Sequence, residues 1–280
     1  MLRFIARRPV LAFMIIGLGA GFLTAAIPPI VNSEILPFEL PLDGVLGGVL
    51  GVGIGAFLVT AALTGRDGVV DLARRSTRWR VPVRWYLVAL FTVPVGATLI
   101  SLVTYGSAAL ASPADGWPGA LAEVTAVFVF QLVLFQLAEE IGFTGFLQHH
   151  WQNRYHPMKV VLYVALLWAV WHLPDHFAEE GWGADALISA PIVFAIEFVS
   201  LFFARALFVW FYNVTANSVL LVAIFHASFD ASISQLSHDV VPASNTAGFL
   251  IFSAVIVVAA TIVIMVTKGR LGRGANDRVR

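Results

Sequence analysis

Long apolar stretches separated by short polar segments dominate the sequence. Eight of them reach or approach the roughly 20 residues that a helix needs to cross the hydrocarbon core of a membrane. They run over 9–31, 44–64, 84–107, 120–148, 158–175, 187–207, 213–234 and 247–267. Helices satisfy their own backbone hydrogen bonds in lipid, so the pattern predicts an all-α, polytopic membrane protein with eight transmembrane helices in one bundle.

The composition supports this prediction. Of the 280 residues, 59% are hydrophobic and 12% are charged, and the mean hydropathy is +0.85. Soluble domains typically contain about 25% charged residues, so this chain lacks the polar residues to cover a water-exposed surface. A soluble enzyme, a disordered chain and a nucleic-acid binder are excluded as classes. Cysteine is absent, which excludes disulfides, thiolate metal sites and a cysteine nucleophile.

The basic residues predict the orientation of the spans. If both termini are cytoplasmic, all 17 Lys and Arg residues fall in segments on the cytoplasmic side. The opposite loops carry only acidic charges, which are Glu34, Glu39, Asp43, Asp115, Asp175, Glu179, Glu180, Asp185 and Asp239. This predicts a multi-pass protein of the cell membrane with cytoplasmic N- and C-termini. We interpret the first stretch as a retained helix rather than a cleaved signal peptide, because its apolar run is long.

Two local patterns predict how the chain meets its surroundings. Glycines recur at small-xxx-small spacing in the second stretch, at Gly47, Gly51 and Gly55, and predict close helix packing. The basic segment 66–84 contains tryptophan. It is either a solvated determinant of topology or a short amphipathic helix on the anionic inner leaflet.

Several ionisable residues lie inside the predicted spans, where charge is costly and indicates function. They are Glu139 and Glu140 in the fourth span, His172 in the fifth, Glu197 in the sixth, and His226 and Asp230 in the seventh. Glu139, His172 and His226 lie about 13–20 Å from the cytoplasmic ends of their helices, which is compatible with one buried cluster. A proton relay, a metal site and a hydrolytic site remain open. Glu197 has no motif around it, and we interpret it as structural.

Three strings carry the candidate chemistry: Glu139-Glu140-x-x-x-Thr144, Trp168-x-x-x-His172 and His226-x-x-x-Asp230. The His-Glu-x-x-His signature of zinc proteases and the phosphate-binding P-loop are absent. The strings resemble the motifs of the CPBP family, which comprises type II CAAX prenyl endopeptidases and bacteriocin-processing or immunity proteins. Those motifs are Glu-Glu-x-x-x-Arg, Phe-x-x-x-His and His-x-x-x-Asn/Asp, in the same order on three core helices.

The resemblance implies an intramembrane endopeptidase that hydrolyses a peptide bond of a membrane-associated protein or peptide. It implies that Glu139 and His172 activate the water, and that His226 and Asp230 stabilise the oxyanion. Supporting positions would be Glu140, Thr144 and Trp168. We expect no metal or other cofactor, although two histidines and a carboxylate can ligate a divalent ion, as in a metalloendopeptidase. The expected partners are a membrane-embedded or membrane-associated peptide substrate and the lipid bilayer, with no nucleic acid.

The resemblance covers residues 60–235, which we expect to be the motif-bearing core of a single integral-membrane domain over 1–280. A short basic cytoplasmic tail over 268–280 would complete it.

Two positions depart from the family motifs. Trp168 replaces the motif phenylalanine, a change that we expect to preserve packing. Thr144 replaces the motif arginine, four residues after Glu140 on the same helix face. Glu140 must then be protonated or neutralised elsewhere, with Arg154 and Arg205 the nearest candidates. The alternative function is therefore a catalytically degenerate member acting as a bacteriocin-immunity or membrane-protein binding factor. A proton-coupled transporter is a weaker third, since no half-molecule symmetry is visible.

Overall fold

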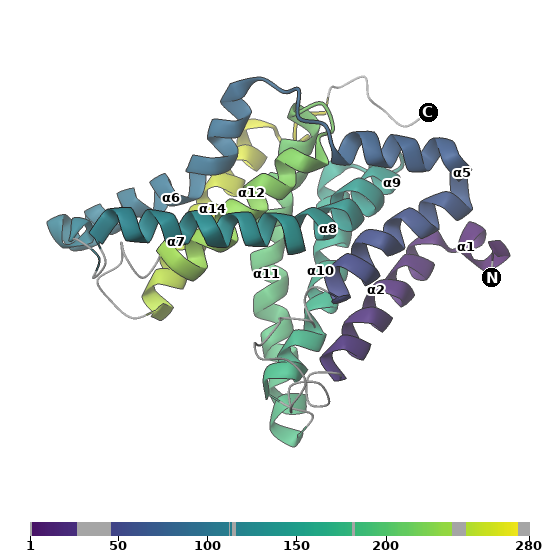
Figure 1. Cartoon of the computed structure of the whole chain (residues 1–280), viewed down its shortest axis with the longest axis horizontal. Helices are drawn as coiled ribbons and strands as arrows, with labels where there is room; N and C mark the ends of the chain where they lie inside the picture. The colour runs from purple at the N-terminus through teal and green to yellow at the C-terminus, as the bar shows by residue number, and fades with distance from the viewer. Residues whose placement is uncertain are drawn as a thin grey trace.

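The computed structural model describes residues 2–26, 46–111, 113, 116–180, 183–236 and 245–273. All regular elements in these ranges are helical, and none is a strand (Figure 1). The all-α fold class is therefore confirmed. The predicted outer-loop acids Glu34, Glu39, Asp43, Asp115 and Asp239 lie outside the described residues, as does the end of the basic tail.

The helices are named in chain order. They are α1 (Leu2–Arg7), α2 (Pro9–Ala26), η1 (Leu46–Ile54), α5 (Gly55–Ser76), α6 (Val83–Tyr105), η2 (Gly106–Leu110), α7 (Gly116–Gln131), η3 (Leu132–Gln136), α8 (Leu137–Glu140), η4 (Ile141–Gln148), α9 (His149–Gln152), α10 (Pro157–Glu180), α11 (Ala184–Val214), α12 (Val219–Ala231), η5 (Ser232–Leu236) and α14 (Asn245–Val266). η2 is a 3₁₀ helix, and the other η segments are π-helical. α7 to α9 form one continuous helix.

Four helical segments are long and apolar enough to cross a membrane, namely Gly47–Ser76, Val83–Leu110, Gly116–Gln152 and Ala184–Val214. Shorter apolar segments are Pro9–Ala20, Pro157–Leu173, Val219–Ser234 and Leu250–Val266. The two sets together fall on the eight predicted stretches. Within the part of the chain that the structure describes, only the first four meet the length criterion, so the count of eight stays a prediction.

Several predicted boundaries are wrong by more than a turn. α10 ends at Glu180 rather than at 175, and α12 begins at Val219 rather than at 213. The second helix does not end at 64, because α5 continues to Ser76 through a kink at Gly65, whose φ of 63° suits glycine. Most of the segment 66–84 is therefore helical, while its position relative to a membrane stays a prediction. α11 does not end at 207 but runs to Val214, since its apolar sequence continues. The turn that follows contains Ala216 and Asn217 at positive φ.

Glycines bring η1 into close contact with helices on two sides. A Cβ on Gly51 would lie 2.6 Å from the Cβ of Ala20 on α2. A Cβ on Gly53 would lie 3.1 Å from the Cβ of Ala138 on α8. The close packing predicted for the second stretch is therefore confirmed.

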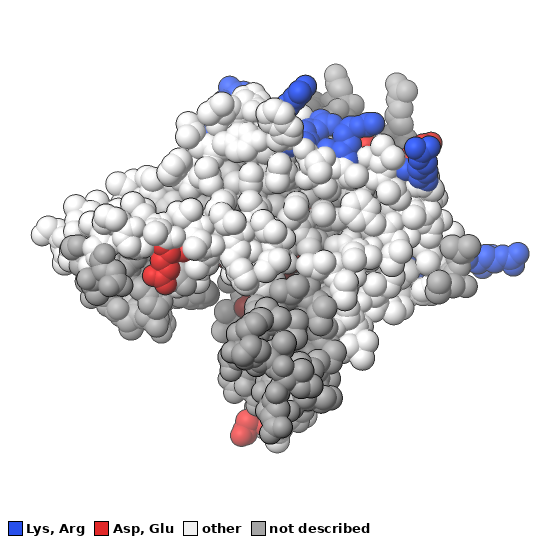
Figure 2. All heavy atoms as spheres, in the orientation of Figure 1, with Lys and Arg blue, Asp and Glu red and all other residues white. Residues whose placement is uncertain are grey.

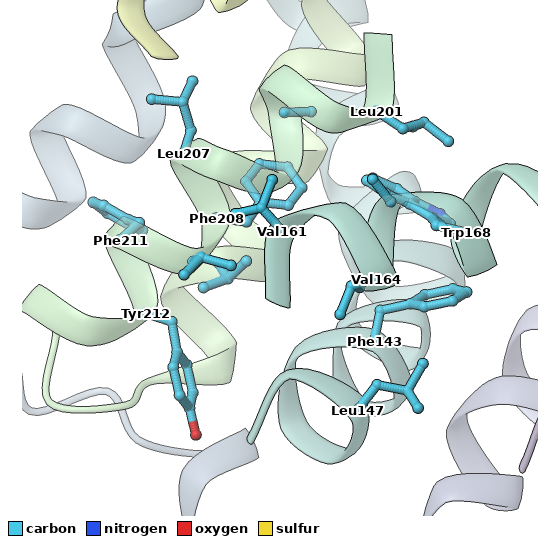
Figure 3. Packing of buried hydrophobic residues seen from close by; sticks show 14 of the residues in the cluster. Phe143, Leu147, Val161, Val164, Trp168, Leu201, Leu207, Phe208, Phe211 and Tyr212 are labelled. Atoms are coloured by element: carbon cyan, nitrogen blue, oxygen red, sulfur yellow. The ribbon is translucent and has the colours of Figure 1, made fainter. Parts of the chain in front are cut away.

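The helix that contains α8 and η4 lies at the centre of the fold, where it contacts α5, α10, α11 and α12 (Figure 1). Around it, aromatic side chains form much of the core. Figure 3 shows buried residues from η4, α10 and α11 packed together, among them Phe143, Trp168 and Phe208. Ring centroids of Phe143 and Trp168 lie 5.8 Å apart, and those of Trp168 and Phe208 lie 6.0 Å apart.

Charged side chains are distributed unevenly over the surface. In Figure 2 the visible Lys and Arg side chains gather along the upper and right-hand edges, and most of the visible acidic ones lie lower. This distribution agrees with the charge segregation read from the sequence. The orientation of the termini stays a prediction.

Candidate active site

The two adjacent glutamates of the first string occupy α8, a single helical turn between the π-helical segments η3 and η4. π-helical turns are rare and are found frequently at functional sites. Glu139 and Glu140 are both buried, and Glu140 is completely inaccessible to solvent. A buried carboxylate is costly unless other groups compensate for its charge, so their surroundings decide what each can do.

Glu140 is held by three neighbouring side chains. Arg205 on α11 binds it in a bidentate manner, with Nη1 3.0 Å from Oε2 and Nη2 3.3 Å from Oε1. The Thr144 hydroxyl donates a hydrogen bond to Oε2, and Nδ1 of His226 lies 3.0 Å from Oε1. Of the two arginines that the sequence suggested, Arg205 therefore neutralises Glu140. Arg154 is exposed.

Aromatic rings surround the Arg205 guanidinium. Its Cζ lies 4.3 Å from the ring centroid of Trp168, 5.1 Å from that of Phe208 and 5.9 Å from that of Phe143. These distances allow cation–π attraction, which is strongest for tryptophan. Trp168 was expected only to preserve packing. It is indeed buried, and in addition it presents its ring to the cation.

His226 and Asp230 share a face of α12, as predicted. Nε2 of His226 lies 3.4 Å from Oδ2 of Asp230. The imidazole is flanked by the rings of Trp168 and Phe208, with centroids 5.1 Å and 5.2 Å away. Oδ2 of Asp230 also accepts a hydrogen bond from Gln136. Gln136 was not identified from the sequence, although it lies four residues before Glu140 on the same helix.

Glu139 and His172 complete the cluster. Glu139 is close enough to His226, His172 and Asp230 to interact electrostatically with each of them. His172 is partly buried, and its ring centroid lies 5.1 Å from that of Trp171 and 5.9 Å from that of Trp168. The structure thus brings the four predicted catalytic residues together, while their roles stay a prediction.

Residues 121–232 match the family model for the type II CAAX prenyl endopeptidase Rce1-like proteins. This part of the chain is therefore similar to the Rce1-like proteins. The family consists generally of proteases. The match lies inside the predicted core 60–235, and it contains all seven predicted site residues together with Arg205 and Gln136. Comparison with curated proteins gives no match.

The clustered histidines and carboxylates are not arranged as metal ligands in the part of the chain that the structure describes. No group of three or more His, Cys, Asp or Glu residues there could hold a metal ion. Arg205 balances the charge of Glu140 instead, and His226 lies between the carboxylates of Glu140 and Asp230. The described donor set therefore gives no support to a metalloendopeptidase-like site, and the expected absence of a cofactor stays a prediction.

A second buried polar network lies toward the predicted cytoplasmic end of the fold. Arg75 donates from Nη1 to the Gly145 carbonyl at 2.8 Å and to the Tyr212 hydroxyl at 3.0 Å, and its Nε lies 2.8 Å from Asp71. Nδ1 of His149 lies 3.1 Å from the same hydroxyl. The network joins α5, η4, α9 and α11. Reasoning from the sequence missed it because no motif contains these residues.

Proposed function

We propose that the protein is an intramembrane endopeptidase that hydrolyses a peptide bond of a membrane-associated protein or peptide. The observation that carries this proposal is the pairing of Arg205 with Glu140 beside Glu139, in the part of the chain that is similar to the Rce1-like proteins. The Arg205 guanidinium forms its ion pair with Glu140. Within the described residues, the Glu139 side chain forms no ion pair and no hydrogen bond, so the Glu139 carboxylate is the one suited to exchange a proton.

In the proposed reaction, Glu139 takes a proton from a water molecule that His172 helps to orient. The resulting hydroxide attacks the carbonyl carbon of the substrate peptide bond, and the carbonyl oxygen becomes an oxyanion. Glu139 then gives the proton to the leaving amine as the carbon–nitrogen bond breaks. The reaction therefore consumes one water molecule and releases two peptides, and Glu139 returns to its starting state.

The oxyanion is stabilised by the ring of His226. Oε1 of Glu140 accepts the Nδ1 proton of this imidazole, so Nε2 is the nitrogen that faces away from Glu140 toward Asp230. When both nitrogens carry protons, Nε2–H can donate to the oxyanion. Asp230, which accepts a hydrogen bond from Gln136, orients the imidazole.

We further propose that eight spans cross the cell membrane and that both termini are cytoplasmic, as a single domain over 1–280 with its basic tail at 268–280. The proposed substrate reaches the site from the bilayer or its surface. The family description suggests prenylated CAAX peptides as the first substrates to test. The distribution of Lys and Arg along the sequence supports this topology.

The test is cleavage of two fluorogenic peptides by the purified protein in liposomes, one farnesylated and one anchored by an apolar helix. Glu139→Gln and His172→Ala should abolish cleavage and remain folded. Glu197→Gln is the matched control, because Glu197 is a partly buried carboxylate on α11 that no hydrogen bond or ion pair joins to the described site. Full activity in Glu139→Gln would overturn the proposal.

The alternative is a non-proteolytic immunity or binding factor. It is favoured by one observation, Thr144 at the position of the motif arginine. A wild-type protein that cleaves neither peptide but protects cells against a bacteriocin, with the same protection in Glu139→Gln, would establish this alternative.

A further inference from the structure

Arg205 is a fully buried cation in the middle of an apolar helix. It forms hydrogen bonds with Glu140 and, from Nη1 at 2.8 Å, with the Thr144 hydroxyl. Its Nε has no hydrogen-bond partner among the described residues. Guanidinium cannot lose its proton in a protein, and a buried ion pair is often no more stabilising than apolar residues of similar volume. Stability alone is therefore a poor explanation for this pair.

One oxygen atom of Glu140 links the Arg205–Glu140 pair to His226, the residue proposed to stabilise the oxyanion. Oε1 of Glu140 lies 3.3 Å from Nη2 of Arg205 and 3.0 Å from Nδ1 of His226. The other oxygen, Oε2, is occupied by Arg205 and Thr144. The carboxylate can therefore rotate in neither direction without breaking an interaction with the guanidinium. The charge and orientation of this carboxylate decide whether His226 carries a proton on Nδ1 in addition to the one on Nε2.

We propose that Arg205 is a positioning residue for catalysis. It holds Glu140 ionised and oriented as the acceptor for Nδ1–H of His226, so that the imidazole keeps protons on both nitrogens and Nε2–H can donate to the oxyanion. This inference rests on the proposed peptidase function. Without the guanidinium, the buried carboxylate is relieved most readily by binding a proton, and a carboxylic acid can donate to Nδ1 instead of accepting from it. The imidazole then loses its second proton, and its neutral Nε2–H is a weaker donor to the oxyanion than that of the doubly protonated ring.

Position 144 offers an internal test of this role. Thr144 lies four residues after Glu140 and already contacts both Glu140 and Arg205. A guanidinium introduced at position 144 would reach Glu140 from its own helix, provided that the space now filled by the Arg205 head group is released. An arginine at position 144 on η4 should therefore be able to replace Arg205 on α11, while Glu140 and His226 keep their positions.

The experiment compares Arg205→Met with the exchange variant Thr144→Arg/Arg205→Met. Methionine fills an apolar space of similar length without a charge. We expect Arg205→Met to lower kcat by up to about a hundredfold with little change in KM, because a weakened oxyanion donor acts on the transition state rather than on substrate binding. The exchange variant should recover kcat to within about tenfold of the wild type.

A second readout does not depend on activity. In protein labelled with ¹⁵N-histidine, the His226 signal, assigned with His226→Gln, should report Nδ1–H in the wild type and in the exchange variant but not in Arg205→Met. Arg75→Met is the matched control. Arg75 is also a buried arginine with several hydrogen bonds, but it does not touch Glu140, so its loss should lower thermal stability and leave the His226 signal unchanged.

The outcomes separate the two proposals. If the wild type cleaves no peptide but the His226 signal follows the cation as described, the positioning geometry stands and the peptidase function fails. If Arg205→Met keeps the wild-type kcat, or if the exchange variant recovers neither kcat nor the signal, the positioning role is refuted. If Arg205→Met does not fold, we expect the exchange variant to fold, because it restores a cation beside Glu140. Misfolding of both variants would also refute the positioning role.

Discussion

Gly142→Ala tests the closest helix contact beside the candidate site. A Cβ at Gly142 would lie 2.3 Å from Cγ1 of Val52, 2.8 Å from Cζ of Phe13 and 3.1 Å from the backbone oxygen of Val52. Both neighbouring side chains are buried, and the third contact is backbone, so η1 must move. Overpacking of this kind costs about 1–3 kcal/mol. With three contacts we take the upper end and subtract about 1 kcal/mol for replacing glycine in a helix, which leaves a loss of about 2 kcal/mol.

Gly19→Ala on α2 is the matched control, because no atom lies within 4 Å of the Cβ that it would introduce. It should gain about 0.5–1 kcal/mol from the reduced flexibility of the unfolded chain. In thermal unfolding in one detergent, Gly142→Ala should lower Tm by about 4–8 °C, while Gly19→Ala should raise it by about 1–4 °C. Because Gly142 follows Glu140 by two residues, Gly142→Ala should also lower kcat. A Tm for Gly142→Ala equal to or above that of Gly19→Ala would refute the close approach of η1 and η4.

Two further predictions concern the second network and the cofactor. Tyr212→Phe removes the hydroxyl that accepts from Arg75 and contacts His149, and should cost about 1–3 kcal/mol in thermal unfolding because buried polar groups lose a partner. Tyr105→Phe should leave Tm unchanged, and an equal loss in both variants would show that the network is not stabilising. Treatment with EDTA or phenanthroline should leave peptide cleavage unchanged. Inactivation that added zinc reverses would show that a metal takes part.

The helical architecture was predictable because an apolar run long enough for a membrane permits little besides a helix. Helix ends were less predictable. The apolar residues up to Val214 read as the start of the next span. Only the turn containing Asn217, with its positive φ, shows that α11 ends there. The kink at Gly65 was equally hidden, because glycine permits such a turn without requiring it.

The residues that form the candidate site were less predictable than the helical architecture. Three motifs on three helices indicated which residues converge, and the shortage of cations limited the partner of Glu140 to two arginines. The choice of Arg205 depends on the packing of α11 against η4, which hydrophobicity does not specify. Nothing local marked Arg75 or Tyr212, since their hydrogen bonds join residues 137 positions apart.

The Arg205–Glu140 pair also has a consequence for the order in which the helices are synthesised and inserted into the membrane. Glu140 leaves the ribosome 65 residues before Arg205 and 86 before His226. At about 5–20 residues per second, this is a wait of roughly 3–13 s for the guanidinium. A waiting glutamate can bind a proton and enter lipid as a neutral acid. Arginine has no such form, and an unpaired one costs about 3 kcal/mol at the centre of a membrane helix. Because Glu140 is synthesised first, its carboxylate is already in place to pair with Arg205 when α11 inserts. The candidate site is complete only after α12, which carries His226 and Asp230, has been synthesised.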